Sequence, residues 1–182
     1  MMSPFIPSDG HPVLDIGVLN RCCALRQSHP VNNEGVRMPD LVGYSHLDLT
    51  VTDGERSARW WQDIMGFELV NRFRGPSFSG WSLMHPTGLV VSVMTHDDGP
   101  TEPFSERRVG LDHLSFHVAD RAELERWIDH LDASGVEHSV IIEYHFGPTV
   151  VLRDPDNIQL ELFVHPSEEV AADLLATDPA HR

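Results

Sequence analysis

The sequence repeats one pattern of residues twice, and this duplication limits the folds that the chain can adopt. Residues 43–53 (GYSHLDLTVTD), shifted by 67 positions, align with residues 110–120 (GLDHLSFHVAD), and a glycine, a histidine, a leucine, a valine and an aspartate recur at matching places. Trp60 falls on Trp127 at the same shift. A period of this length indicates two copies of one supersecondary unit, which gene duplication explains simply.

A second match extends both copies. Residues 83–93 (LMHPTGLVVSV) align with residues 152–162 (LRDPDNIQLEL) at a shift of 69, so the copies differ by only two residues in the helix or its turn. The first repeat therefore covers about residues 43–96, and the second covers about residues 110–164.

Each repeat has the pattern of a strand, a helix and three further strands. Asp53 and Asp120 stand where a helix N-cap is expected, and Gly66 is placed to end the first helix. The expected helices are residues 53–65 and 120–134. The expected strands are residues 43–51, 67–73, 78–84 and 88–96, then 110–118, 138–143, 147–153 and 157–164. The pattern predicts an α+β domain of two βαβββ units within residues 38–165, an irregular N-terminal arm over residues 1–37, and an acidic tail over residues 166–182.

Composition excludes several functions. The 182 residues suit one domain, and 13 basic residues against 28 acidic ones give a net charge of −15, which repels nucleic-acid phosphates and anionic membranes. Every basic residue is arginine, so Schiff-base chemistry through a lysine amine is excluded. Cys22 and Cys23 are adjacent and poorly placed to bridge each other, and no apolar run reaches the roughly 18 residues of a membrane span. We expect a cytoplasmic protein that acts on a small molecule, with no nucleic-acid or membrane partner.

Strand side chains alternate between two faces, so residue parity predicts one apolar and one polar face for each sheet. In the first strand Leu47, Leu49 and Val51 form an apolar set that we expect beneath the helix. The opposite faces are predicted to carry His46, Asp48 and Thr50; Val90, Ser92, Met94 and His96; His113, Ser115 and His117; and Gln159, Glu161 and Phe163.

Three of these polar residues suggest a metal site. An unpaired carboxylate on a concave sheet face is costly, and a divalent cation compensates for it. His46, His113 and Glu161 would leave coordination positions open, so we expect one divalent ion, Fe, Mn, Zn or Ni. The two histidines are repeat-related, which favours this interpretation. The alternative is that each histidine is a hydrogen-bonded core or surface residue that the duplication copied.

Four segments together resemble the vicinal oxygen chelate superfamily, which includes glyoxalase I, type I extradiol dioxygenases, fosfomycin-resistance thiol transferases, methylmalonyl-CoA epimerases and bleomycin-resistance proteins. They are SHLDLTVTD, WWQDIMGFELV, LDHLSFHVAD and RDPDNIQLELF, within about residues 40–165. The resemblance implies a cup of mixed β-sheet around a metal ion, with ligands from the first, fifth and eighth strands. It also implies a homodimer, and in similar proteins the cup closes either within one chain or across two.

Ser92, the repeat partner of Glu161, separates the branches of this superfamily. Glyoxalase I and the epimerases have a fourth ligand there, extradiol dioxygenases and fosfomycin-type transferases use only the His, His, Glu trio, and bleomycin-binding members lack the trio. The favoured expectation is an oxidoreductase of the three-ligand extradiol dioxygenase type. A glyoxalase-like lyase or isomerase, a thiol transferase, and a metal-free binding or resistance protein are the alternatives. The dioxygenase match is incomplete, because the expected active-site tyrosine meets Val151.

A metal with adjacent vacant positions can hold and polarise two neighbouring substrate oxygens, and proton transfer then needs a nearby base. The candidates on the predicted metal side and its rim are His96, Asp48, His117 and Tyr144. The alternative role for each is to orient a ligand or to lie on a solvated surface. Trp81, in the third strand, is expected either to wall the pocket or to pack elsewhere.

Overall fold

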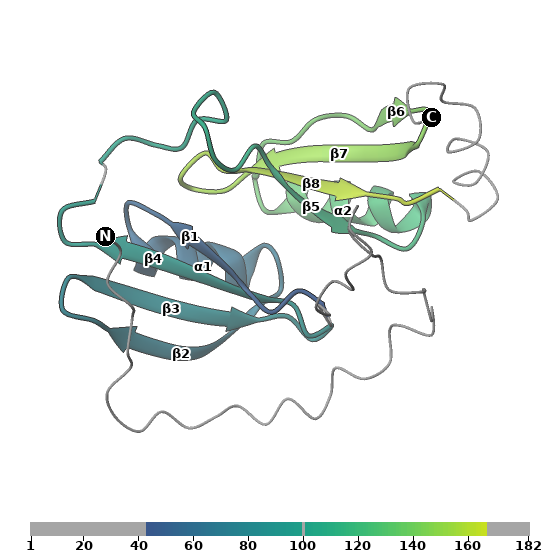
Figure 1. Ribbon diagram of the computed structural model, residues 1–182. Coiled ribbons are helices and arrows are strands. Elements are labelled where there is room, and N and C mark those ends of the chain that lie inside the picture. The colour runs from purple at the N-terminus through teal and green to yellow at the C-terminus, as the bar shows by residue number, and fades with distance from the viewer. Residues whose placement is uncertain (1–42, 100, 167–182) are drawn as a thin grey trace, which may run out of the picture. The chain divides into compact units, whose positions relative to one another are not determined.

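The computed structural model describes residues 43–99 and 101–166, and all of its helices and strands lie beyond Ser45 (Figure 1). The expected arm, residues 1–37, and all but the first residue of the expected tail lie outside the described residues. The described residues therefore comprise the two repeats and the segment that joins them.

Both repeats fold into a strand, a helix and three strands, which confirms the predicted α+β architecture. The first repeat contains β1 (Leu47–Thr50), α1 (Gly54–Asp63), β2 (Glu68–Arg74), β3 (Phe78–Met84) and β4 (Val90–His96). The second contains β5 (Leu114–His117), α2 (Arg121–Ala133), β6 (Ile142–Tyr144), β7 (Gly147–Arg153) and β8 (Gln159–Phe163). The sheet orders are β1-β4-β3-β2 and β5-β8-β7-β6, and in each sheet the first and last strands of the repeat pair in parallel.

Several strands are shorter than the sequence suggests. β1 and β5 both begin four residues later than expected, and the repeat-related Gly43 and Gly110, which were expected to start these strands, have φ angles of 146° and 150°, outside strand geometry. The strand expected over residues 138–143 is reduced to β6, and His138 makes only an isolated bridge with Leu152. The ladders are correspondingly short at these edges of the two sheets.

The helix boundaries follow the predicted capping residues. The Asp53 carboxylate accepts a hydrogen bond from the Arg56 amide at 3.0 Å, and the Asp120 carboxylate accepts one from the Glu123 amide at 2.8 Å. Gly66 follows α1 with a φ angle of 72°, a conformation that glycine adopts without strain. Both N-caps and the first stop signal are thus confirmed.

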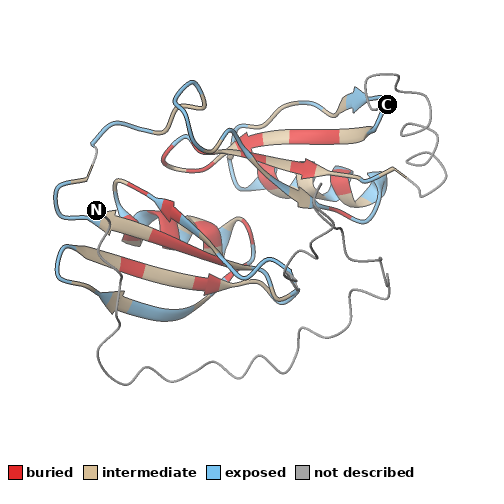
Figure 2. Cartoon of the chain, in the orientation of Figure 1, coloured by how far each residue is buried: buried red, intermediate tan, exposed pale blue. Residues whose placement is uncertain are grey.

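The apolar faces of the two sheets and the two helices form one core. Buried residues run along the central strands of both sheets and on the helices (Figure 2). Trp61 is fully buried, and its ring contacts Phe67 of the first repeat and Phe116 of the second, with centroid distances of 5.2 and 6.0 Å. Aromatic packing therefore joins the repeats on the helix side of the sheets.

A buried carboxylate also joins the repeats. Asp156, in the turn between β7 and β8, is only 3% exposed and accepts hydrogen bonds from the Thr52 amide at 3.0 Å and the Thr52 hydroxyl at 2.5 Å. Its second oxygen accepts from the Ser57 hydroxyl and from Arg56, each at 3.1 Å. We call these four contacts the Asp156 latch. They attach the second repeat to the beginning of α1.

The equivalent turn of the first repeat lacks the latch. In both turns, however, a side chain accepts a hydrogen bond from the backbone amide two residues later. Asp154 accepts a hydrogen bond from the Asp156 amide at 2.9 Å, and at the matching position His85 Nδ1 accepts one from the Thr87 amide at 3.3 Å. Thr87 stands where Asp156 stands in the second repeat. The first repeat therefore has no carboxylate at this position.

Candidate metal centre

The polar faces predicted from parity are present in both sheets. Leu49 and Val51 are buried, whereas His46, Asp48 and Thr50 are exposed. The second sheet follows the same rule: Leu160 and Leu162 are buried, and Ser115 and His117 are exposed. Glu161 lies between these extremes, with a side chain 18% exposed. Burial therefore follows the predicted alternation at these positions.

His113 and Glu161 come together on the polar face of the second sheet. His113 directly precedes β5, and the neighbouring Ser115 pairs with Glu161 across the parallel β5–β8 ladder. His113 Nε2 lies 3.8 Å from a carboxylate oxygen of Glu161. Two donors that each lie about 2.1 Å from one cation are separated by at most about 4.2 Å, so these two atoms are close enough to reach one ion.

His46 does not join this pair within one chain. It directly precedes β1 in the first sheet, at the place that His113 occupies in the second. In residues 43–99 and 101–166, no three His, Cys, Asp or Glu side chains are grouped so that they could hold one ion. One chain therefore brings together two of the three predicted ligands.

The candidates of the first sheet occupy the same polar face. Asp48 pairs with Ser92 across the β1–β4 ladder. The Ser92 hydroxyl is buried and lies 3.1 Å from the Ser82 hydroxyl, with which it shares a hydrogen bond. His96 lies at the end of β4, and its ring packs against Phe78 at 6.1 Å. A buried hydroxyl thus replaces an acidic ligand at the position equivalent to Glu161.

The candidates of the second sheet belong to an aromatic cluster. His117 pairs with Phe163 two residue pairs along the ladder from the Ser115–Glu161 pair, and its ring centroid lies 4.4 Å from that of His165. The ring centroids of Phe146 and Phe163 are 5.8 Å apart. Tyr144 stacks on Phe146 with a centroid distance of 5.0 Å and an interplanar angle of 7°. We call these five residues the aromatic rim. Tyr144 and Phe146 are both partly open to solvent.

Sequence reasoning placed Phe163 on this face but missed Phe146. The residue that could have indicated the position of Phe146 is Gly147, at the tip of the β6–β7 hairpin, which has a φ angle of 142°. A Cβ at this position would lie 2.1 Å from the Val164 carbonyl oxygen and 3.0 Å from the Phe163 ring. The hairpin therefore approaches Phe163 closely because this residue has no side chain.

Trp81 does not wall the polar face. Its indole N–H donates to Glu55 of α1 at 3.1 Å, and a Cβ on Gly54 would collide with its ring. Trp81 has the same parity as the buried Leu83, so it lies on the helix side of β3. Of the two roles expected for this tryptophan, the pocket-wall role is wrong.

The arginine of the β7–β8 ladder, Arg153, is already engaged. Arg153 pairs with Gln159 in the β7–β8 ladder and donates to its side-chain oxygen at 3.1 Å. It also donates to both carboxylate oxygens of Glu106, at 3.2 and 3.3 Å, and this hydrogen bond lowers the pKa of Glu106. Sequence reasoning missed Glu106, which lies in the segment that joins the repeats.

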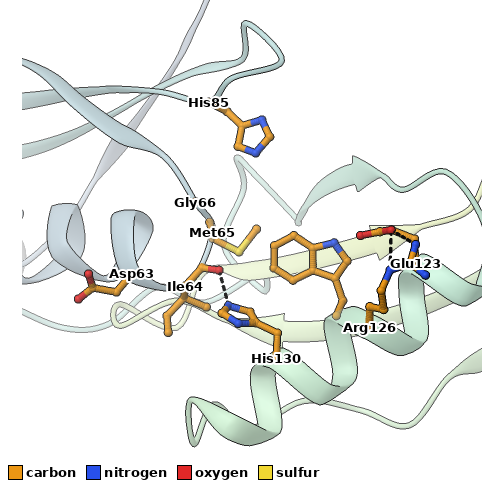
Figure 3. Close-up of a pocket in the computed structure, with 9 residues that line it drawn as sticks. Asp63, Ile64, Met65, Gly66, His85, Glu123, Arg126 and His130 are labelled. Atoms are coloured by element: carbon orange, nitrogen blue, oxygen red, sulfur yellow. Dashed lines mark hydrogen bonds and ion pairs between the residues drawn. The ribbon is translucent and has the colours of Figure 1, made fainter.

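A groove of about 320 Å³ lies elsewhere, between the end of α1 and the exposed side of α2 (Figure 3). His130 Nε2 donates to the Ile64 carbonyl oxygen at 2.9 Å at one side of it. Burial lowers the pKa of His85, which faces the groove from the turn between β3 and β4. The groove is lined by Asp63, Ile64, Met65, Gly66, His85, Glu123, Arg126, Trp127 and His130. It contains none of the predicted ligands.

Two βαβββ repeats that each present an open polar face define a class of α+β domains. Within that class, the family model described as the Glyoxalase/Bleomycin resistance protein/Dioxygenase superfamily matches residues 43–162. A glyoxylase/bleomycin resistance protein/dioxygenase domain from Frankia sp. EAN1pec has a crystal structure 37% identical in sequence, which covers 70% of this chain and 100% of that one with a TM-score of 0.66. The chain therefore belongs to this superfamily, and the resemblance found in the sequence is confirmed.

Two further relatives match the same region. The uncharacterized protein YqjT of Bacillus subtilis (strain 168) is 28% identical over 125 residues, which are 64% of this chain and 94% of that protein. A variant of the fosfomycin resistance protein FosX from Listeria monocytogenes, complexed with Mn(II) and 1S,2S-dihydroxypropylphosphonic acid, is 20% identical, covers 74% of this chain and 99% of that one, and has a TM-score of 0.58. At this identity the likeness to FosX concerns the fold. Neither helix among the described residues is long and apolar enough to cross a bilayer.

Proposed function

We propose that this protein is a divalent-metal-dependent enzyme that binds a small substrate through two neighbouring oxygens, most like the three-ligand extradiol dioxygenases. The observation that carries the proposal is the 3.8 Å approach of His113 Nε2 to Glu161 on the polar face of the second sheet. A bound divalent ion would supply Lewis-acid polarisation of the substrate oxygens. The FosX complex with Mn(II) supports metal binding on this fold.

The third ligand in this proposal is His46 of the partner subunit. In one chain the core joins the helix sides of the two sheets, and His46 and His113 remain exposed on the opposite faces. A two-fold axis that brings His46 of one copy to the His113–Glu161 pair of a second copy generates a second, identical site. In this arrangement a homodimer would contain two complete sites.

The aromatic rim favours a flat, unsaturated substrate such as an aromatic diol. Phe163 lies two residues beyond Glu161 on the same strand face, which places its ring about 7 Å along the sheet from the carboxylate. Aromatic side chains bind planar ligands by offset or edge-to-face contact. A substrate with a phosphonate group would instead need a free cation nearby, and Arg153 is already bound by Glu106 and Gln159.

The chain's own groups can move the proton that a bound diol releases. We assign His117 as the first acceptor, because it has the parity of the metal-side face and pairs with Phe163, two residues beyond Glu161 on β8. Tyr144, on the neighbouring hairpin, would then orient the substrate from the rim. Asp48 and His96 occupy the polar face of the first sheet and would approach the same site from the partner subunit.

A metal-free binding or resistance protein is the second candidate function. The observation that favours it is that no three ligand side chains are grouped among the described residues of one chain. A glyoxalase-like lyase or isomerase and a thiol transferase differ from the lead proposal only in the reaction. Oxygen uptake with catechol under Fe(II), compared with turnover of thiol adducts, separates those reactions.

Metal analysis of protein purified without chelators tests the proposal. We expect one equivalent of a divalent metal per chain, either retained or taken up from added Fe, Mn, Ni or Zn, and its loss in His46→Ala, His113→Ala and Glu161→Ala. His85→Asn, a histidine change in the groove, is the matched control and should bind metal normally. If the parent chain takes up no metal, the metal-free function replaces the lead proposal.

Mixed dimers test the shared site. Chains carrying His46→Ala and chains carrying His113→Ala should each fail to bind metal alone, and a purified mixed dimer should regain one intact site. A site built within one chain would give no recovery, because each chain would still lack one ligand.

A further inference from the structure

The two predicted ligand histidines share a contact that their ligand role does not require. In each repeat the residue immediately before the histidine bonds to the histidine Nδ1 atom. Asp112 accepts from His113 Nδ1 at 2.6 Å, and the Ser45 hydroxyl lies 3.1 Å from His46 Nδ1. Ser45 and Asp112 are separated by the same 67-residue shift as the histidines. The duplicated fold has kept the contact although the two side chains differ.

This contact determines which ring nitrogen is free. A carboxylate can only accept a hydrogen bond, so the proton of a neutral His113 ring lies on Nδ1 and the lone pair lies on Nε2. Nε2 is the atom that faces Glu161 at 3.8 Å. Metal-bound histidines generally donate their second nitrogen to a carboxylate or carbonyl, which fixes the ring orientation and raises its basicity.

The two contacts differ in strength. A hydrogen bond to a charged acceptor is shorter and stronger than one to a neutral partner, and the Asp112 contact is the shorter by 0.5 Å (3.1 against 2.6 Å). A hydroxyl can also donate, so Ser45 accommodates either tautomer of His46. The Asp112 contact therefore favours a His113 ring whose Nε2 is free, whereas the Ser45 contact orients His46 only weakly.

We infer that Asp112 is a positioning residue that pre-sets His113 for metal binding through Nε2, and that Ser45 is its weaker counterpart at His46. The inference rests on the proposed function, because it assigns the role of His113 as a ligand. Asp112 touches neither substrate nor metal in this scheme, and it acts only through the imidazole. Its side chain is 72% exposed, so removing it should not disturb folding.

Chelator competition with Mn(II) and Zn(II) measures the effect on affinity. Asp112→Ala should weaken binding about 10- to 100-fold, Asp112→Asn should recover part of the loss, and Ser45→Ala should weaken binding less than Asp112→Ala does. Ser45→Asp, which places a carboxylate at the equivalent position, should tighten binding. Asp129→Ala, an exposed acidic residue of α2, is the control for lost charge and should have little effect.

Nitrogen NMR of the metal-free protein at pH 8 gives a readout that needs no metal. His113 should be the Nδ1-protonated tautomer in the parent chain and should shift toward the Nε2-protonated form in Asp112→Ala. Equal affinity of Asp112→Ala and parent, or an unchanged tautomer, would overturn the inference. A parent chain that binds no metal would instead overturn the proposed function, and the tautomer measurement would still decide the role of Asp112.

Discussion

Removing the Asp156 carboxylate should cost a large part of the stability of the fold. Asp156→Ala leaves the Thr52 amide and the fully buried Ser57 hydroxyl without their acceptor. Each buried group left unsatisfied costs about 1–3 kcal/mol. The side chain of Arg56 is 49% exposed, so the broken ion pair adds little. We expect the free energy of unfolding to fall by about 3–5 kcal/mol, out of a total of about 5–15 kcal/mol for a typical domain.

Urea unfolding followed by circular dichroism at pH 7.5 measures this loss. Protein concentration must be held constant, because association stabilises the folded chain. Asp156→Asn keeps one acceptor oxygen and should lose about 1–2 kcal/mol, and Arg56→Ala should lose less than about 1 kcal/mol. If Asp156→Ala loses under about 1 kcal/mol, or no more than Arg56→Ala, the latch does not join the repeats energetically.

Two further predictions concern the same region and the aromatic rim. Burial raises the pKa of Asp154 from 3.8 to about 6, and its second oxygen has no partner among the described residues. The folded chain therefore favours the protonated form of Asp154. Protonation of this carboxyl contributes about 3 kcal/mol to the free energy of unfolding below about pH 4, and this contribution is lost as pH rises through 6. Asp154→Asn should flatten that dependence in urea titrations between pH 4 and 7, and a slope equal to that of the parent would contradict the assignment. Gly147→Ala should lower stability by about 2–4 kcal/mol, because a Cβ would strike the Val164 carbonyl. Gly135→Ala, where the φ angle is 66° but nothing lies within 4 Å, should cost only about 1 kcal/mol, so equal losses in thermal melts would exclude the steric explanation.

The sequence was sufficient for the repeat, the strand faces and the helix caps because each depends on neighbouring residues. Parity correctly separated the buried Leu49 and Leu160 from the exposed Asp48, since alternation along a strand is a local property. The same rule, applied from Leu83, would have assigned Trp81 to the helix side.

Contacts between distant segments could not be predicted in this way. Asp156 lies 104 residues from Thr52, and nothing near either residue indicates that they meet. The aromatic rim likewise depends on how one hairpin bends at Gly147. The repeat alone did not show that His113 and Glu161 lie close together. That prediction also needed the family resemblance, which implied that the fifth and eighth strands both contribute ligands. The place of His46 as a third ligand depends on a second copy of the chain and stays a prediction.

The Asp156 latch has a consequence for how the duplicated halves can change over time. At a junction held by four hydrogen bonds to one carboxylate, every replacement of Asp156 should cost stability. The equivalent turn of the first repeat has Thr87 in place of that carboxylate, and His85 in the same turn lines the groove together with Glu123. Replacements there remove few bonds and should be nearly neutral for folding. Substitutions in the turn that contains His85 and Thr87 should therefore accumulate more readily than substitutions of Asp156.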